Sequence, residues 1–148
     1  MSLKETINND IKTAMKAKDK ETLAVLRMIK TAVQAAEIDK KSELTAEEEL
    51  TILSREAKQR RDSIAEFEKA GRQELVEKTQ GELVIVEKYL PEQLSLEEVQ
   101  AKIAEIAEQV GATTQKEFGK LMGAVMQALK GQADGNVIKE QVKAHLNK

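Results

Sequence analysis

The sequence predicts an all-α protein of two domains: a four-helix module over residues 1–90, joined at a proline hinge to a three-helix bundle over residues 95–148. Three observations support this prediction. The 148 residues are rich in the strong helix formers Ala, Glu, Lys, Leu and Gln, and apolar residues recur at helical spacing. The single proline, Pro91, interrupts this pattern, because proline cannot continue a helix.

Capping signals define the first two helices. Ser2 and Glu5 have the spacing of a capping box, which opens a first helix that we expect to end near Lys18. Asp19 can cap a second helix that runs to about Glu37. Apolar residues recur every three or four positions in both segments, so each helix presents one side to a core.

The next two helices are expected to be neighbours joined at a glycine. Thr45 and Glu48 form another capping-box pattern and open a long third helix. This helix stops at Gly71, because glycine readily takes the left-handed conformation that ends a helix. The fourth helix covers residues 72–89.

Three more helices are expected in the C-terminal part. Ser95 begins a third capping box and starts the first of them. Thr113 or Thr114 caps the next one, and a turn at residues 134–136 precedes the last helix, expected over residues 137–147.

The composition excludes several classes of function. With no cysteine, the chain has no thiolate nucleophile and no sulfur-rich zinc site, and we expect neither metal nor cofactor. The one histidine, His145, is expected to pack at the edge of a helix. Ser54 and Ser63 have no neighbouring base, so no catalytic residue is predicted. Without an apolar leader or about 20 consecutive apolar residues, the chain is expected in the cytoplasm and not in a membrane.

Charge is distributed unevenly although the net charge is only −2. Residues 92–110 hold one lysine and five acids, whereas residues 111–148 hold six lysines and three acids. The C-terminal end is therefore the basic one. The aromatic residues are needed for the core, which removes the stacking platform of a single-strand binder, and no DNA partner is expected.

Two opposite charges lie on apolar helix faces. At 100° per residue, Arg60 falls within the apolar arc of the third helix and Glu82 within that of the fourth. A charge left alone there would cost several kcal/mol, so the two are expected to form a structural ion pair that fixes helix register. The alternative is that Arg60 is free to bind a phosphate.

The sixth predicted helix contains Gly119 and Gly123 beside its apolar stripe, with Lys116 and Lys130 on the same side. Glycine in a helix interior costs roughly 1 kcal/mol relative to alanine, so something is expected to approach closely. One candidate is a tightly packed neighbouring helix. The other is an RNA backbone whose phosphates are neutralised by the lysines.

Several segments resemble the YqeY-like proteins of bacteria, over nearly the whole chain. The matching segments are residues 56–63 (EAKQRRDS), 67–72 (FEKAGR), 89–95 (YLPEQLS), 119–126 (GKLMGAVM) and 130–135 (KGQADG). One departure is Gln80-Gly81, where similar proteins favour helix-forming residues, so the fourth helix is expected to be softer there.

The resemblance implies a fold and a partner more than an activity. The C-terminal part is similar to the tail domain of the B subunit of the tRNA-dependent amidotransferase (GatB), a helical appendage that meets tRNA. The residues that the resemblance implies are the RNA-facing Lys120, Lys130 and Lys139, with Gly123, Gly131, Asp134 and Gly135 shaping the helix and the turn. A carbon–nitrogen ligase activity with glutamine as amide donor would belong to the larger enzyme, because this chain offers no residues to perform it.

Three hypotheses follow. The first is a non-catalytic module that binds tRNA or associates with a tRNA-modifying or aminoacylating enzyme. The second is a protein-interaction adaptor for which RNA is irrelevant. The third is an accessory part of a glutamine-dependent ligase complex.

Overall fold

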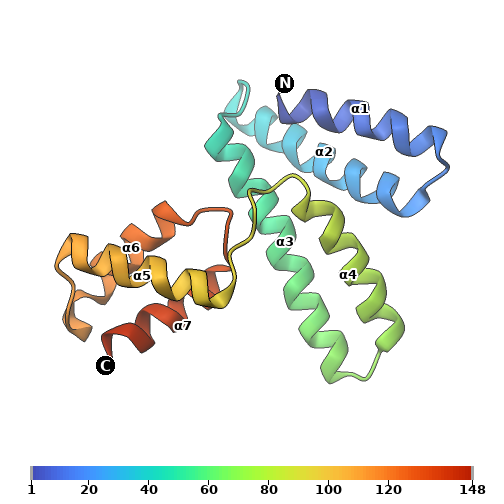
Figure 1. The fold of residues 1–148 in the computed structure, drawn as a ribbon. Helices are drawn as coiled ribbons and strands as arrows, with labels where there is room; N and C mark the ends of the chain where they lie inside the picture. Colours follow the sequence, from blue (N-terminus) through green and yellow to red (C-terminus); the bar gives the residue numbers. More distant parts are fainter. Residues whose placement is uncertain (1, 148) are drawn as a thin grey trace. The chain divides into compact units, whose positions relative to one another are not determined.

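The computed structural model describes residues 2–147, and within this range the protein is all-helical, with seven α-helices and no strand (Figure 1). The predicted all-α class is therefore confirmed. The chain divides into two compact units, Met1–Leu90 and Pro91–Lys148, so the break falls at the single proline. No helix among residues 2–147 is both long enough and apolar enough to cross a membrane.

The N-terminal unit contains four helices: α1 (Leu3–Lys16), α2 (Lys20–Lys40), α3 (Ala46–Lys69) and α4 (Gln73–Glu87). α1 packs on α2, α3 and α4 form a long hairpin, and α2 contacts both arms of that hairpin. The far ends of α3 and α4 project beyond α1 and α2 (Figure 1). The fully buried side chains of the core come from all four helices and include Ile7, Val25, Leu26, Ile29, Leu53, Ala57 and Val86.

Local capping fixes most helix starts in this unit. The Thr45 hydroxyl accepts a hydrogen bond from the Glu48 N–H at 3.1 Å, while the Glu48 carboxylate accepts one from the Thr45 N–H at 2.9 Å. Three helix ends differ from the prediction. α4, expected to reach residue 89, ends at Glu87. α1 ends at Lys16 because Lys18 takes a left-handed conformation with φ 57°, and α2 runs three residues further than expected, until Lys41 does the same with φ 64°.

The C-terminal unit contains α5 (Leu96–Val110), a short 3-10 helix η1 (Gln115–Glu117), α6 (Phe118–Ala128) and α7 (Gly135–Leu146). The three α-helices contact one another pairwise. They enclose a second core whose buried members are Val99, Ile103, Ala107, Ala112, Leu121, Val125, Leu129, Ile138, Val142 and Leu146.

Two helix starts in this unit differ from the prediction. A 3-10 turn begins after Thr114 and precedes α6, so the expected single helix is two elements. α7 begins two residues earlier than predicted, at Gly135, because the Asp134 carboxylate accepts the Asn136 N–H at 2.8 Å and caps the helix there.

Candidate functional site

The outer face of α6 is exposed. Gly119 and Gly123 are both exposed, and a Cβ added at either would meet no atom of another element within 4 Å. At 100° per residue, Gly119, Lys120, Gly123 and Gln127 fall within an arc of about 100°. We call these four residues the α6 glycine face. A tightly packed neighbouring helix, one of the two explanations expected for the glycines, is not found among residues 2–147.

The predicted lysines lie in η1, α6 and α7 and in the turn between α6 and α7. Lys116 lies in η1 and Lys120 in α6, and both side chains are exposed. Lys139 is exposed on α7, whereas Lys130 follows the end of α6 in the turn and is partly buried. Lys116 and Lys130 are separated by about 20 Å along the helix axis, so they cannot contact the same phosphate.

A carboxylate also lies at the start of α6, yet it is engaged elsewhere. Glu117 accepts the backbone N–H groups of Thr113 and Thr114 at 3.2 and 3.3 Å. The first of these bonds is the main cause that lowers the pKa of Glu117, so the group stays charged. Its charge is balanced by backbone dipoles, and no ion pair between Glu117 and Lys116 or Lys120 is observed among the described side chains.

The turn between α6 and α7 is held by local hydrogen bonds. Gly131 has φ 80°, a conformation that favours glycine, and its carbonyl accepts the Gln93 side-chain amide at 2.7 Å. The Gln132 carbonyl accepts the Leu94 N–H at 2.9 Å. A Cβ at Gly135 would make only an ordinary contact, 3.6 Å from Met126 Cε. Gly131 and Asp134 therefore shape the turn and the start of α7.

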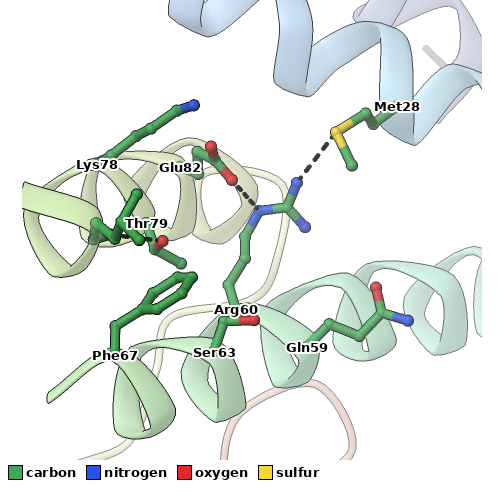
Figure 2. A pocket seen from close by; sticks show the side chains of 9 residues that line it. Met28, Gln59, Arg60, Ser63, Phe67, Lys78, Thr79 and Glu82 are labelled. Atoms are coloured by element: carbon green, nitrogen blue, oxygen red, sulfur yellow. Dashed lines mark hydrogen bonds and ion pairs between the residues drawn. The ribbon is translucent and has the colours of Figure 1, made fainter. Parts of the chain in front are cut away.

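A second feature, in the N-terminal unit, surrounds Arg60. This side chain is only 5% exposed, although it carries a charge. Its Nε lies 3.3 Å from Oε1 of Glu82 (Figure 2). Its Nη1 lies 3.7 Å from Oε1 of Glu56. The two residues of the expected ion pair thus lie together, with Glu56 as an additional carboxylate that the sequence reasoning missed.

Few of the five N–H donors of the Arg60 guanidinium have a strong hydrogen-bond acceptor. Nη1 donates to the Glu56 backbone carbonyl at 3.1 Å, and Nη2 donates to the Met28 sulfur at 3.6 Å. The buried Nε–H makes no hydrogen bond despite its proximity to Glu82. Buried donors are normally satisfied, so this guanidinium is short of acceptors.

Arg60 lines a hollow of about 310 Å³ between α2, α3 and α4. The other residues of this Arg60 pocket are Met28, Gln59, Ser63, Phe67, Leu75, Lys78, Thr79 and Glu82 (Figure 2). A helical wheel could place Arg60 and Glu82 on facing stripes. It could not bring in Met28 from α2, because that contact spans 32 residues of sequence.

These features define an all-helical protein with an exposed, lysine-edged helix face in one unit and a buried arginine at a pocket in the other. Residues 4–146 match the profile of the Yqey-like protein family. The chain therefore belongs to the YqeY-like family, and the resemblance noted in the sequence is confirmed.

Three curated relatives carry the name altered inheritance of mitochondria protein 41, mitochondrial. The Kluyveromyces lactis protein is 38% identical over 104 residues, which cover 68% of this chain and 56% of the relative. The Pyrenophora tritici-repentis protein is 31% identical over 130 residues, covering 84% and 69%. The Saccharomyces cerevisiae S288c protein is 38% identical over 85 residues, covering 57% and 46%. The match thus spans about half to two thirds of these relatives.

The cytoplasmic localisation expected from the sequence is contradicted by these relatives, whose names place them in mitochondria. The expectation rested on the lack of long apolar segments, which does not by itself indicate a compartment.

Proposed function

We propose that this chain is a non-catalytic RNA-binding module that contacts the backbone of a folded RNA, tRNA in the first instance, through the α6 glycine face. One observation carries the proposal: Gly119 and Gly123 lie on an exposed helix surface with no neighbour that requires them. Each costs up to about 1 kcal/mol relative to alanine, and no contact within the described chain offsets this cost. A close approach from outside would offset it.

Charge next to the glycines supports a polyanionic partner. Lys116 and Lys120 are exposed one helical turn apart, at the same end of α6 as Gly119. Glu117, between them, accepts hydrogen bonds from backbone amides and, within residues 2–147, pairs with neither lysine, so both ammonium groups can contact phosphates. The two lysines predict a shallow salt dependence, with a slope of about −2 in log affinity against log salt.

The α6 glycine face has no aromatic residue, which limits the way in which it could recognise an RNA. The only aromatic side chain of the C-terminal unit, Phe118, is partly buried and packs against the core. Base stacking on this face is therefore excluded as the mode of recognition. Shape and phosphate contacts suit a double-helical or otherwise folded RNA.

The proposal is tested by fluorescence anisotropy with tRNA at several salt concentrations, using the chain with Gly119→Ala/Gly123→Ala. We expect the variant to be more stable, by up to about 1 kcal/mol per site, because alanine favours the helix. We also expect it to bind tRNA about tenfold more weakly, because two methyl groups hold the backbone away. Higher stability with unchanged tRNA binding would contradict the proposed surface.

A lysine variant with a matched control tests the charges. Lys116→Ala/Lys120→Ala should weaken tRNA binding and reduce the salt slope by about 2. Lys12→Ala/Lys16→Ala removes two exposed lysines of the same spacing from α1 and should leave binding unchanged. Equal losses in both variants would indicate non-specific attraction and would overturn the assignment of the site.

A protein partner is the second candidate, and Met126 favours it. This side chain is 42% exposed one turn after Gly123, and methionine is adaptable at protein interfaces. Binding of such a protein partner would be lost in the Gly119→Ala/Gly123→Ala variant but would not depend on salt concentration. The role as an accessory part of a glutamine-dependent ligase stays a prediction.

A further inference from the structure

The Arg60 pocket is independent of the proposed RNA surface and has a ligand chemistry of its own. In this pocket, Arg60 Nη2 donates a hydrogen bond to the thioether sulfur of Met28 at 3.6 Å. Sulfur is a weak acceptor, whereas a guanidinium binds a carboxylate through two parallel, charge-assisted hydrogen bonds. Met28 is 52% exposed and unbranched, so its side chain can move aside for a better acceptor.

The charges around the pocket select the class of anion. Arg60 and Lys78 contribute two positive charges, and Glu56 and Glu82 contribute two negative charges. A phosphate dianion would leave this site with two uncompensated negative charges, which is costly in a partly buried position. A zwitterion adds no net charge, so the net charge of the occupied site stays at zero. The phosphate-binding alternative for Arg60 is therefore disfavoured.

The position of the groups fits a zwitterion with an apolar body. Arg60 lies between Glu82 and Met28, and Lys78 lies on the far side of Glu82 from Met28 (Figure 2). Glu82 makes a poorly directed contact with Arg60 and is partly exposed, so it can accept from an ammonium group. Phe67 and Leu75 supply apolar wall, and a volume of about 310 Å³ is at the small end of ligand pockets.

We propose that the Arg60 pocket binds a free amino acid with an apolar side chain. Its carboxylate replaces Met28 as the acceptor for Arg60. Its ammonium group donates to Glu82, and its side chain lies against Phe67 and Leu75.

The test is an NMR titration of the full chain with L-leucine, followed through backbone amide shifts. Saturable shifts at residues 59–63 and 75–82 are expected. 4-Methylpentanoate is leucine without its ammonium group and 3-methylbutylamine is leucine without its carboxylate, so each should bind at least about tenfold more weakly than leucine. Inorganic phosphate should produce no saturable shift at these amides.

Variants separate the site from the stability of the fold. Lys78→Ala removes an exposed positive charge from the lining of the pocket, which leaves the site net negative, and should weaken leucine binding severalfold, whereas Lys12→Ala, on α1 and outside the lining, should not change it. Absence of shifts up to millimolar leucine would overturn the proposal. Equal binding of leucine and 4-methylpentanoate, or tighter binding of phosphate, would overturn the role of Glu82 and with it the proposal of a zwitterion.

Discussion

Two glycines of the α3–α4 hairpin have opposite constraints. Gly71, in the turn, has φ 70°, which side chains with a Cβ rarely adopt. Gly81, inside α4, has ordinary helical geometry, and a Cβ there would meet Oε1 of Glu21 at 2.7 Å. Glu21 is exposed and its carboxylate is the far end of a flexible chain, so it can shift.

Alanine substitution should therefore change stability in opposite directions at these two residues. Gly81→Ala is expected to raise the free energy of unfolding by about 0.5–1 kcal/mol, because alanine favours the helix. Gly71→Ala is expected to lower it by about 1 kcal/mol, because its φ is positive. Urea denaturation of both variants measures the two changes. A loss of stability in Gly81→Ala would mean that Glu21 cannot move and that α2 needs the glycine.

Arg60 shows at the scale of one residue why a buried charge is kept. Removing it would leave Glu56, which is 8% exposed, and Glu82 without their cation. Breaking a buried ion pair in this way is strongly destabilising, whereas the intact pair contributes little to stability. Structural need alone thus explains why the position is charged. It does not explain the unsatisfied Nε–H or the weak Met28 acceptor.

At the scale of elements, α3 begins with a charge-dependent cap. The Lys40 ammonium group and, next, the Thr45 N–H both donate to the Glu48 carboxylate, and together they lower its pKa to about 2. A group whose pKa is lowered in the folded state stabilises that state when ionised. The contribution of Glu48 should be fully present above its ordinary pKa of 4.5 and lost as pH falls through about 2.

This cap can be followed by carboxyl NMR titration of Glu48. We expect a midpoint near 2 in the intact chain, and a clear rise toward 4.5 in Lys40→Ala, which removes the largest cause of the shift. Thr45→Val keeps the backbone N–H that donates to Glu48 and should move the midpoint less than Lys40→Ala does. A midpoint near 4.5 in the intact chain would show that the lysine contact does not persist in solution.

At the scale of the whole molecule, the chain contains two hydrophobic cores that share no residue. The segment before α5 is held by the C-terminal unit itself. The Leu94 N–H donates to the Gln132 carbonyl and the Gln93 side-chain amide donates to the Gly131 carbonyl, both in the turn after α6. A helical fold of this size is expected to be marginal but able to form alone.

The two units should therefore fold separately. Residues 91–148 expressed alone are expected to keep their helical circular dichroism and to unfold cooperatively on heating, as are residues 1–90. The intact chain, measured by calorimetry, is the reference. A C-terminal fragment without helical signal would show that its stability depends on the rest of the chain, and the tRNA assay would then require the full protein.

Sequence by itself determined the features that depend on residues close together in the chain. The all-α class and the capping of α3 and α5 follow from hydrogen bonds between residues three apart, as in Thr45 with Glu48 and Ser95 with Glu98. The ends of α1 and α2 were placed less well, because Lys18 and Lys41 take left-handed conformations that no glycine or asparagine signals.

Only the tertiary structure decided what surrounds each candidate residue. The glycine spacing in α6 was visible in the sequence, but it was compatible with a packed helix or an open face until α5 and α7 were placed. Likewise, the wheel put Arg60 on an apolar arc, yet its contact with Met28 depends on α2 crossing the α3–α4 hairpin. Helical periodicity records which side of a helix is buried, whereas packing between distant segments determines which atoms cover it.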